Sequence, residues 1–451
     1  MSIVSLSPVG NDEQYFTAQG VVAGSGFQLF TYTAGTLNPV ATYTDITGLT
    51  PNANPIILNS TGRAPQEIWI PAGVSVKFVL KDQNNVVQWT RDNIPGINDV
   101  LAFSGVSAAM LPVVQAATVD AGRAAMGIAG DNLIVGDMQV WQRGLVFNNA
   151  SVSSGFYTCD RWGANRNSDV AGMTIFRTGL GVQSLPRFGI GQQRAPGNAS
   201  AAPMNLFYTA ETMDSQGLAG QTITFSVYCG AAANYSGGNV TLTLFSGTGV
   251  DERVYAFTGS ATLGSSSTSI NIGSYKRLSV TVTVPTNASE VGLSTSWTPS
   301  GTAGANDYVV FAAPKLEIGS VATPFIARPF AQELSMCQRY YEKSFPYVTA
   351  PAQNAGSTGA LCFTQAVAAS TVSQGNQISF KVTKRTGVGC IIYNPAAANG
   401  QARNLGTGAD CSTLVATTGP SDSGQSVQFV TAPGSAAGDV NAFHWTNDAE
   451  L

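Results

Sequence analysis

Hydrophobic and polar residues alternate with a period of two along much of this chain, and this alternation is typical of half-buried β-strands. In residues 74–81, Val, Val, Phe and Leu at the even positions alternate with Ser75, Lys77 and Lys81. A Gln-Asn-Asn turn follows at 83–85, and residues 86–94 form a second strand-like run. The two runs and the turn between them predict a β-hairpin.

The same alternation returns between residues 131 and 328, in runs that are separated by turn-rich loops. It is clearest in residues 222–229, 239–247 and 277–285, where Val, Leu or Ile face inward and Thr or Ser face outward. Cys229 shares the inward face of its run, so we expect it to be a small core residue. Several short strands at this spacing predict an antiparallel sandwich of jelly-roll type.

Residues 101–130 differ from both β regions because they are rich in Ala and Met. Thr118 is a suitable N-cap, Asp120 falls in the first turn, and Gly127 follows the last apolar position. This order predicts a short helix that links two β modules. Its small apolar side chains are also suited to line a symmetry axis.

A second helix is predicted over residues 329–346, because apolar residues recur there at spacings of three and four. Pro329 suits the first turn of such a helix, and Pro346 ends the pattern. The expected buried stripe consists of Phe330, Leu334, Cys337, Tyr341 and Phe345. The residues expected at the sides or outside are Glu333, Gln338, Arg339 and Glu342. Arg339 and Lys343 are like-charged neighbours four residues apart, so we expect both to find partners outside the helix.

Together the patterns predict an all-β fold in five parts. These are a small N-terminal β anchor domain (1–100), a short helical linker (101–130), an antiparallel jelly-roll-like sandwich (131–328), a connecting helix (329–346) and a C-terminal β domain (347–451). Only 11% of the 451 residues are charged, whereas Gly alone accounts for 49 residues. That composition suits short strands joined by turns better than helices with salt-bridged surfaces.

Charge and hydropathy exclude several classes of partner. The net charge is −4 and no basic stripe is visible, so we expect no nucleic-acid binding. No run approaches the roughly 18 apolar residues of a transmembrane helix, so we expect no membrane insertion. The N-terminus has neither a basic segment nor an apolar core, so we expect no secretory signal.

The cysteine and histidine content argues against a metal or cofactor site. None of the six cysteines belongs to a C-x-x-C pair, and His444 is the single histidine. We therefore expect free thiols formed in a reducing cytoplasm, no metal and no cofactor. Cys337 has no histidine near it in sequence and faces the apolar stripe, which makes it an unsuitable nucleophile.

The sequence predicts no catalytic residue. A Ser-His-Asp mechanism needs a histidine base, and His444 is not accompanied by a G-x-S-x-G elbow. A glycosidase needs only two carboxylates, so the 26 acidic residues leave that alternative open. Asp251 and Glu252 would point to opposite faces of a strand, and local hydrogen bonding explains Asp137 and Asp160 equally well.

Sugar binding fits the remaining polar and aromatic residues best. Tyr235 lies in a polar loop beside Asn234 and Asn239, and Trp297 lies at the edge of another loop. An aromatic ring with neighbouring amides is a suitable platform for a glycan, so these four residues are the predicted glycan contacts. The favoured alternative for Trp297 is that it covers an edge of the sandwich. For the tryptophans at 141 and 162, a core position is the stronger interpretation.

The order of several motifs resembles the tail fibre and tailspike-type proteins of short-tailed bacteriophages. The first hundred residues contain FQLFTYTAGTLNPVATYTD, NPIILNSTGRAPQEIWI and VKFVLKDQNNVVQWTRDNI in that order, which resembles a virion-anchoring domain. GDMQVWQRGLVF, YTCDRW and APKLEIGSVATPFIARPFAQELSMCQRYYEKSF are similar to a jelly-roll-like module with a trailing helix. The ending FHWTNDAEL also resembles the close of such chains, whereas residues 347–435 match in pattern only.

The resemblance implies a homotrimeric protein of the virion tail that is assembled in the host cytoplasm. Residues 1–100 would dock on phage tail or adaptor proteins, and the C-terminal half would bind host surface polysaccharide or lipopolysaccharide. Tailspikes that cleave polysaccharide usually carry a long parallel β-helix, and the sandwich pattern here puts that activity in doubt. The expected function is therefore a non-enzymatic tail fibre, with a structural tail adaptor and a depolymerase tailspike as the alternatives.

Overall fold

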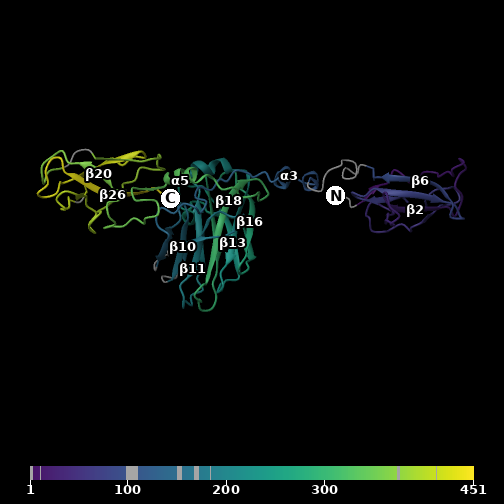
Figure 1. The fold of residues 1–451 in the computed structure, drawn as a ribbon, viewed down its shortest axis with the longest axis horizontal. Coiled ribbons are helices and arrows are strands. Elements are labelled where there is room, and N and C mark those ends of the chain that lie inside the picture. Colours follow the sequence, from purple (N-terminus) through teal and green to yellow (C-terminus); the bar gives the residue numbers. More distant parts are fainter. Residues whose placement is uncertain are drawn as a thin grey trace. The chain divides into compact units, whose positions relative to one another are not determined.

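The computed structural model confirms the all-β class, since every pair of named strands is antiparallel and the helices are short. The chain separates into two compact units, Met1–Ala117 and Thr118–Leu451 (Figure 1). The residues that the structure describes are 4–10, 12–97, 110–149, 155–166, 172–182, 184–372, 376–412 and 414–451. Residues 101–109 of the predicted linker therefore lie outside the described residues.

The first unit is built on a four-stranded sheet with the order β3-β2-β5-β6. Its strands are β2 (Gln28–Thr33), β3 (Ile56–Ile57), β5 (Val76–Lys81) and β6 (Val87–Ile94), and a separate pair joins β1 (Val4–Leu6) to β4 (Trp69–Pro71). The predicted hairpin is β5–β6, with Phe78 and Leu80 fully buried. Asn85 takes a φ of 65° in its turn, a conformation that Asn tolerates well.

Two short helices follow, α2 (Leu111–Val114) and α3 (Val119–Ala125). The helix predicted from Thr118 is confirmed in α3, where the Thr118 side chain accepts a hydrogen bond from the backbone N–H of Ala121 at 3.1 Å. No residue of α3 is buried. Within the described part of the chain, no helix has both the length and the apolar character needed to cross a membrane.

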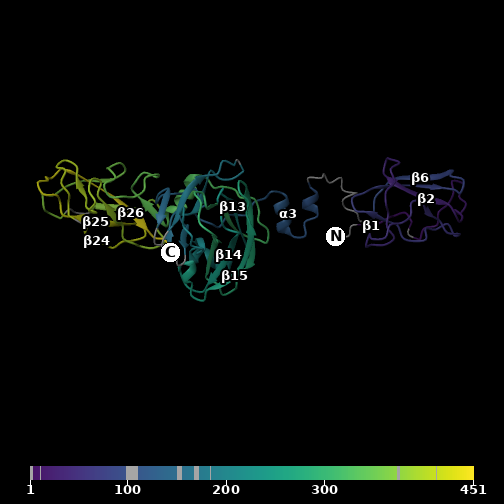
Figure 2. The ribbon, with the colours of Figure 1, turned by 90° about the horizontal axis from the view of Figure 1, so that it is seen from below.

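The second unit contains a sandwich of two six-stranded antiparallel sheets (Figure 2). In order, the first sheet consists of β16 (Tyr275–Thr283), β13 (Thr222–Ala231), β18 (Tyr308–Ile318), β11 (Phe188–Arg194), β10 (Met173–Gly179) and β7 (Val146–Asn149). The second sheet consists of β15 (Ala261–Ser269), β14 (Asn239–Gly247), β17 (Glu290–Trp297), β12 (Met204–Thr209), β9 (Gly163–Arg166) and β8 (Phe156–Tyr157). The chain changes sheet at each step from β11 to β14 and from β15 to β18, which is the jelly-roll type of connectivity.

The core between the two sheets is formed by the inward residues of the alternating runs. Ile223, Phe225, Val227 and Cys229 on β13 are all fully buried, as their alternation predicts. Trp141 and Trp162 are also fully buried and belong to the same core, so their predicted structural role is confirmed. The sandwich connections also contain three single-turn elements, α4 (Thr212–Ser215), η1 (Gln216–Leu218) and η2 (Val254–Ala256).

The predicted connecting helix over 329–346 is wrong in its second half. Helix α5 covers only Phe330–Gln338, and the chain then forms strand β19 (Tyr341–Lys343) on the edge of β26 (Val440–Asp448). Strand pairing satisfies the backbone of β19, and the guanidinium carbon of Arg143 lies 3.8 Å from the centre of the Tyr341 ring. These long-range contacts outweigh the local helical spacing.

The predicted sides of this helix are also partly wrong. Glu333, Gln338 and Glu342 are buried, whereas Phe330 is 49% exposed. Glu333 and Glu342 have cationic partners in Arg328 and Lys384, which explains why their burial is tolerated. The expectation that Arg339 and Lys343 find partners elsewhere is confirmed, because Arg339 pairs with Glu211 at 2.6 Å and the Lys343 ammonium donates to three backbone carbonyls.

The C-terminal module is organised around β26, the longest of its strands. β26 pairs with β19 and with β20 (Leu361–Thr364), β22 (Ile391–Tyr393) and β23 (Arg403–Asn404). A three-stranded sheet adds β21 (Asn376–Ser379), β25 (Gly424–Phe429) and β24 (Leu414–Thr418). After β21 the chain leaves the sheet, and Lys384 in this segment forms a buried ion pair with Glu342.

Candidate ligand-binding pocket

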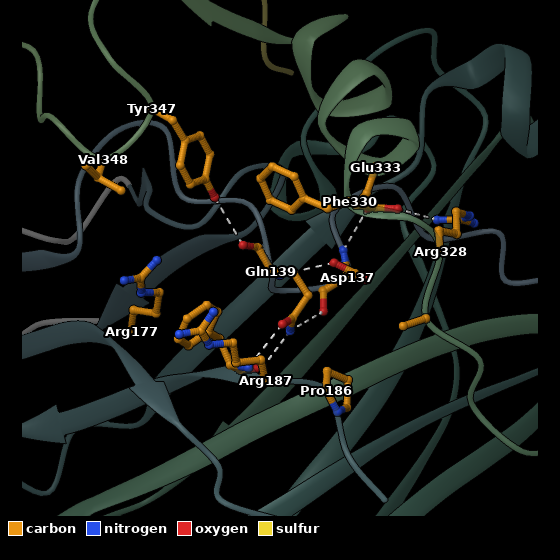
Figure 3. A pocket seen from close by; sticks show the side chains of 12 residues that line it. Asp137, Gln139, Arg177, Pro186, Arg187, Arg328, Phe330, Glu333, Tyr347 and Val348 are labelled. Atoms are coloured by element: carbon orange, nitrogen blue, oxygen red, sulfur yellow. Dashed lines mark hydrogen bonds and ion pairs between the residues drawn. The ribbon is translucent and has the colours of Figure 1, made fainter. Parts of the chain in front are cut away.

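A pocket of about 610 Å³ lies in the second unit, between the β10–β11 hairpin and the start of α5 (Figure 3). Its walls come from separate stretches of the chain, at residues 137–139, 177, 186–188, 327–333 and 347–348. Its volume falls within the range of roughly 300–1,000 Å³ that small-molecule sites in proteins occupy.

The hairpin places a cation and an aromatic ring at one side of the pocket. Ile175 on β10 and Ile190 on β11 are buried core residues. Arg177 lies opposite Ile190 in the strand pair, and Phe188 lies two residues from Ile190, so both side chains continue the core face at the end of the strands. The guanidinium carbon of Arg177 lies 4.1 Å from the centre of the Phe188 ring.

A second guanidinium contacts the same ring. The guanidinium carbon of Arg187 lies 4.9 Å from the centre of Phe188. Figure 3 shows Arg177 and Arg187 close together on one side of the pocket. Among the described residues, neither side chain forms a salt bridge or a side-chain hydrogen bond, so two positive charges share this wall without a counter-charge.

Gln139 holds Phe188 in position. Its side-chain amide donates to the carbonyl of Phe188 at 2.6 Å and accepts from the N–H of Phe188 at 3.0 Å. The carbonyl of Gln139 in turn accepts from the Tyr347 hydroxyl at 3.2 Å, and that hydroxyl accepts from the N–H of Trp141 at 2.8 Å. The ring of Tyr347 is therefore fixed by two hydrogen bonds before any ligand arrives.

The opposite wall is apolar and open to solvent. Phe330, on the first turn of α5, packs edge-to-face on Tyr347 with their ring centres 5.3 Å apart. Phe330 is 49% exposed and Val348 is 59% exposed. An aromatic pair and an exposed aliphatic side chain thus form a surface on which an apolar ligand face can pack.

Two carboxylates lie deeper in the pocket. One oxygen of Glu333 accepts from the N–H groups of Gly136 and Asp137 at 2.5 and 2.9 Å, and the other pairs with Arg328 at 2.8 Å. Burial, together with the nearby charge of Glu333, raises the pKa of Asp137 to about 7. The network connects the start of α5 to the 134–139 segment, which accounts for the burial of Glu333.

This arrangement suits binding better than acid–base catalysis. Asp137 has the raised pKa of a general acid, but it is 2% exposed and accepts from the N–H of Gln139 at 3.1 Å. Both oxygens of Glu333 are already engaged by protein donors. The accessible groups of the pocket are therefore the two free guanidiniums and the aromatic wall.

The predicted glycan contacts lie elsewhere, and none of the four lines this pocket. Trp297 is 1% exposed, and its indole N–H donates to Gln192 at 2.9 Å between the two sheets. Trp297 as a glycan contact is therefore wrong, because its position on the inward face of β17 buries the ring. Trp297 has a structural role, but it packs in the core between the sheets on the inner strand β17 and does not cover an edge of the sandwich.

Tyr235, Asn234 and Asn239 lie near Trp297 but do not form an open platform. The Tyr235 ring packs on Trp297 at 5.1 Å, and burial raises the pKa of its hydroxyl. Asn234 uses its side-chain oxygen to accept from the N–H of Asn306 at 3.1 Å, which fastens two loops together. Asn239 is exposed at the start of β14. The glycan role of these three residues stays a prediction.

The pocket residues escaped the sequence prediction because they come from distant segments. One signal was present, since Met173, Ile175 and Arg177 alternate onto a single face and the arginine continues a core pattern. A charge at such a position marks the place where the core face meets solvent. Phe330 was assigned to the buried stripe of a helix and Glu333 to its outer side, and the position of Glu333 in the pocket depends on a partner nearly 200 residues away.

The single histidine is part of the C-terminal module's packing. His444 is 1% exposed and stacks on Phe345 with ring centres 4.0 Å apart. Its ring nitrogens hydrogen-bond Ser344 Oγ and the carbonyl of Gly356, each at 2.9 Å. Burial lowers the pKa of His444. In the described part of the chain, no three His, Cys, Asp or Glu side chains lie close enough to hold a metal ion.

No protein-family model matches the chain, and no curated protein matches it significantly. Similar solved structures include the enzymatically active domain of tailspike protein 4 from bacteriophage CBA120, at 10% identity and a TM-score of 0.25. That match covers 38% of this chain, which spans only 22% of the tailspike structure.

Carbohydrate-binding modules of family 22 are also similar. The CBM22-1 xylan-binding domain from Paenibacillus barcinonensis Xyn10C is 11% identical, with 43% of this chain and 98% of that one covered and a TM-score of 0.26. The C-terminal family 22 module of Clostridium thermocellum Xyn10B is 11% identical, with 42% and 100% covered and a TM-score of 0.25. Likeness at these TM-scores carries no argument about the function of this chain.

Proposed function

We propose that this chain is a non-enzymatic phage tail fibre protein, with an N-terminal unit that attaches to the tail and a second unit that binds host-surface glycan. The tail assignment is supported by the order of motifs in the first hundred residues and around 313–345. The glycan assignment is supported by one observation above all, the preassembled pocket with an exposed aromatic wall.

The pocket is well suited to an uncharged sugar face together with a few polar groups. Ligand sites are mostly apolar, with a small number of placed polar groups that set orientation. Phe330 and Tyr347 provide the apolar wall here, and the guanidiniums of Arg177 and Arg187 are donors without acceptors in the described residues. Because Gln139 and the backbone already fix Phe188 and Tyr347, little ordering would be needed on binding.

Glycan binding is tested by Phe330→Ala in the full chain, measured as adsorption of labelled protein to host cells. We expect adsorption to fall about tenfold, since truncation of a central aromatic contact commonly costs that much affinity. The matched control is Ile326→Ala, which removes an exposed apolar side chain four residues earlier that does not line the pocket. Equal adsorption by both variants would place the glycan site elsewhere.

Tail attachment is tested by expressing the chain without residues 1–100 during phage assembly. The second unit has its own cores, so the shortened chain should remain folded and be missing from purified particles. Incorporation of the shortened chain into particles would contradict the anchor assignment.

The two alternatives give different results in the same assays. A structural adaptor would enter particles but show no adsorption to host cells or polysaccharide. A depolymerase would release new reducing ends from host polysaccharide, and the Asp137–Glu333 pair in the pocket is the observation that favours it. If release occurs and stops in Asp137→Asn, the non-enzymatic assignment is wrong.

A homotrimer is part of the proposal. Helix α3 buries none of its residues, and Val119 is 80% exposed although it is a large apolar side chain. Met126 and Ile128 just after the helix are about half exposed. Contact between copies of the chain would cover these side chains. Sedimentation equilibrium of the purified protein should therefore give the mass of three chains, and Val119→Asp should lower that mass.

A further inference from the structure

We propose that the pocket selects an anionic sugar, meaning a sugar ring that carries a carboxylate or a phosphate, and that Arg177 and Arg187 bind its charge. This inference rests on the proposed glycan-binding function and adds the class of ligand. The supporting observation is that two guanidiniums without acidic partners and an aromatic wall line the same pocket.

The first step of the argument is the charge of the pocket wall. Arg177 and Arg187 lie 4.1 and 4.9 Å from the same ring centre, and in the described residues no carboxylate lies within ion-pair distance of either. Two other partly exposed arginines of the second unit, Arg339 and Arg403, pair with Glu211 and Asp410. Two like charges held together disfavour each other, and an anion between them would remove that cost.

The acidic side chains of the pocket do not neutralise the charges of Arg177 and Arg187. Glu333 is neutralised by Arg328 at 2.8 Å, and it also accepts two backbone N–H groups. Asp137 is buried, and its raised pKa of about 7 reduces its negative charge near neutral pH. The accessible side of the pocket is therefore positive, although the whole chain carries a net charge of −4.

The second step is the distinction between a sugar and a simple anion. Phe330 and Tyr347 form an edge-to-face pair opposite the arginines, and Val348 extends that wall. A small inorganic anion would leave this surface and most of the 610 Å³ volume unused. A sugar ring has apolar C–H faces for the aromatic wall and an acidic substituent for the guanidinium forks, which bind carboxylate and phosphate in bidentate geometry.

The test compares matched probes on the full chain by isothermal titration calorimetry. The probes are a tri-galacturonate, its carboxyl-reduced neutral counterpart and mannose 6-phosphate. We expect at least one acidic probe to bind about tenfold or more tightly than the neutral one, with affinity that falls as salt is raised from 50 to 300 mM. Comparing the affinities for tri-galacturonate and mannose 6-phosphate shows whether a carboxylate or a phosphate is preferred.

Arg177→Gln and Arg187→Gln should each reduce this preference by about tenfold, and the double variant should abolish it. Neither side chain forms a hydrogen bond with the described residues, so unchanged melting temperatures would show that the fold is intact. Arg123→Gln, an exposed arginine of α3, is the control with the same change in net charge and should bind like the parent chain.

Equal binding of the acidic and neutral probes, or full binding by the double variant, would overturn the anionic-sugar inference. If the labelled protein still adsorbs to host cells in that case, the proposed glycan-binding function is not contradicted. Loss of adsorption together with no binding of any probe would instead contradict the proposed function itself.

Discussion

Asp137 lines the pocket with its carboxyl group buried, and that burial couples its titration to folding. Burial, followed by the charge of Glu333, raises its pKa to about 7, whereas the pKa of an aspartate in an unfolded chain is about 3.9. A group whose pKa is higher in the folded state binds more protons there. Its contribution to stability is therefore full below about pH 4 and is lost as the pH rises through about 7.

Asp137→Asn should remove this pH dependence, because the amide is neutral at every pH and can still accept from the N–H of Gln139. Relative to the parent chain, we expect the variant to gain about 3 kcal/mol in unfolding free energy between pH 4.5 and pH 8. Urea unfolding of both chains at several pH values measures the difference. Since all other carboxylates are common to the two chains, a difference that does not change with pH would contradict the assigned shift.

At the scale of one element, α5 combines a buried apolar side with polar groups that anchor it. Cys337 is fully buried with Val135, Val140 and Tyr340, and Leu334 packs partly on the same cluster. Burial raises the pKa of the Cys337 thiol, which leaves it protonated and poorly reactive. The helix is therefore a structural element, and its cysteine is a packing residue.

Two substitutions on α5 should have opposite outcomes. Cys337→Ala removes one buried sulfur and should cost no more than about 1 kcal/mol. Leu334→Asp brings a charge to the apolar cluster and should cost about 2 to 4 kcal/mol of unfolding free energy. Thermal unfolding of both variants measures these costs. A large loss in Cys337→Ala would assign the thiol a role beyond packing.

The junction after α5 depends on a buried ion pair that links β19 to the segment after β21. Lys384 lies 2.5 Å from Glu342, and both side chains are inaccessible to solvent. Lys384 also donates to the carbonyl of Gln338 at the end of α5. Burial lowers the pKa of Lys384, so the charged state depends on this partner.

Removing one member of that pair should lower the free energy of unfolding by more than the intact pair contributes to it. Glu342→Gln and Lys384→Met should each cost about 3 to 5 kcal/mol, since each leaves the other group buried without its partner. The double variant should cost clearly less than the sum, which a double-mutant cycle by chemical denaturation measures. Additive costs would mean that the two side chains are not coupled.

Across the second unit, the segment 448–451 joins the C-terminal module to the sandwich. Glu450 lies 2.5 Å from Arg161 and 3.4 Å from Arg143, two nearly inaccessible guanidiniums of the sandwich's first segments. The Tyr157 hydroxyl donates to the carbonyl of Leu451 at 2.9 Å. These contacts connect residues almost 300 positions apart and position the 341–349 stretch that completes the pocket.

Glu450→Gln should therefore destabilise the second unit by about 2 to 4 kcal/mol, because two buried cations lose their shared counter-charge. Asp448→Asn is the matched control, since Asp448 is about half exposed, pairs with Arg143 at 3.0 Å and otherwise accepts from the backbone N–H of Glu450 at 3.3 Å. We expect the control to cost less than about 1 kcal/mol in thermal unfolding. Equal costs would show that solvent reaches both guanidiniums.

The sequence by itself determined the features that depend on neighbours within a few residues. Alternation over 222–229 and 74–81 predicted strands and their buried faces, and Thr118 with Asp120 predicted the start of α3. These predictions hold because side-chain period and capping are local properties of the backbone.

Only the tertiary structure decided where α5 ends, which charges are buried and where a ligand can bind. The helical spacing continues through Tyr341 and Phe345, yet pairing with β26 turned Tyr341–Lys343 into a strand. Trp297 was a candidate contact in sequence and is a core residue in space. The pocket joins residues 137–139, 177, 186–188, 327–333 and 347–348, and no local pattern encodes contacts made by distant segments.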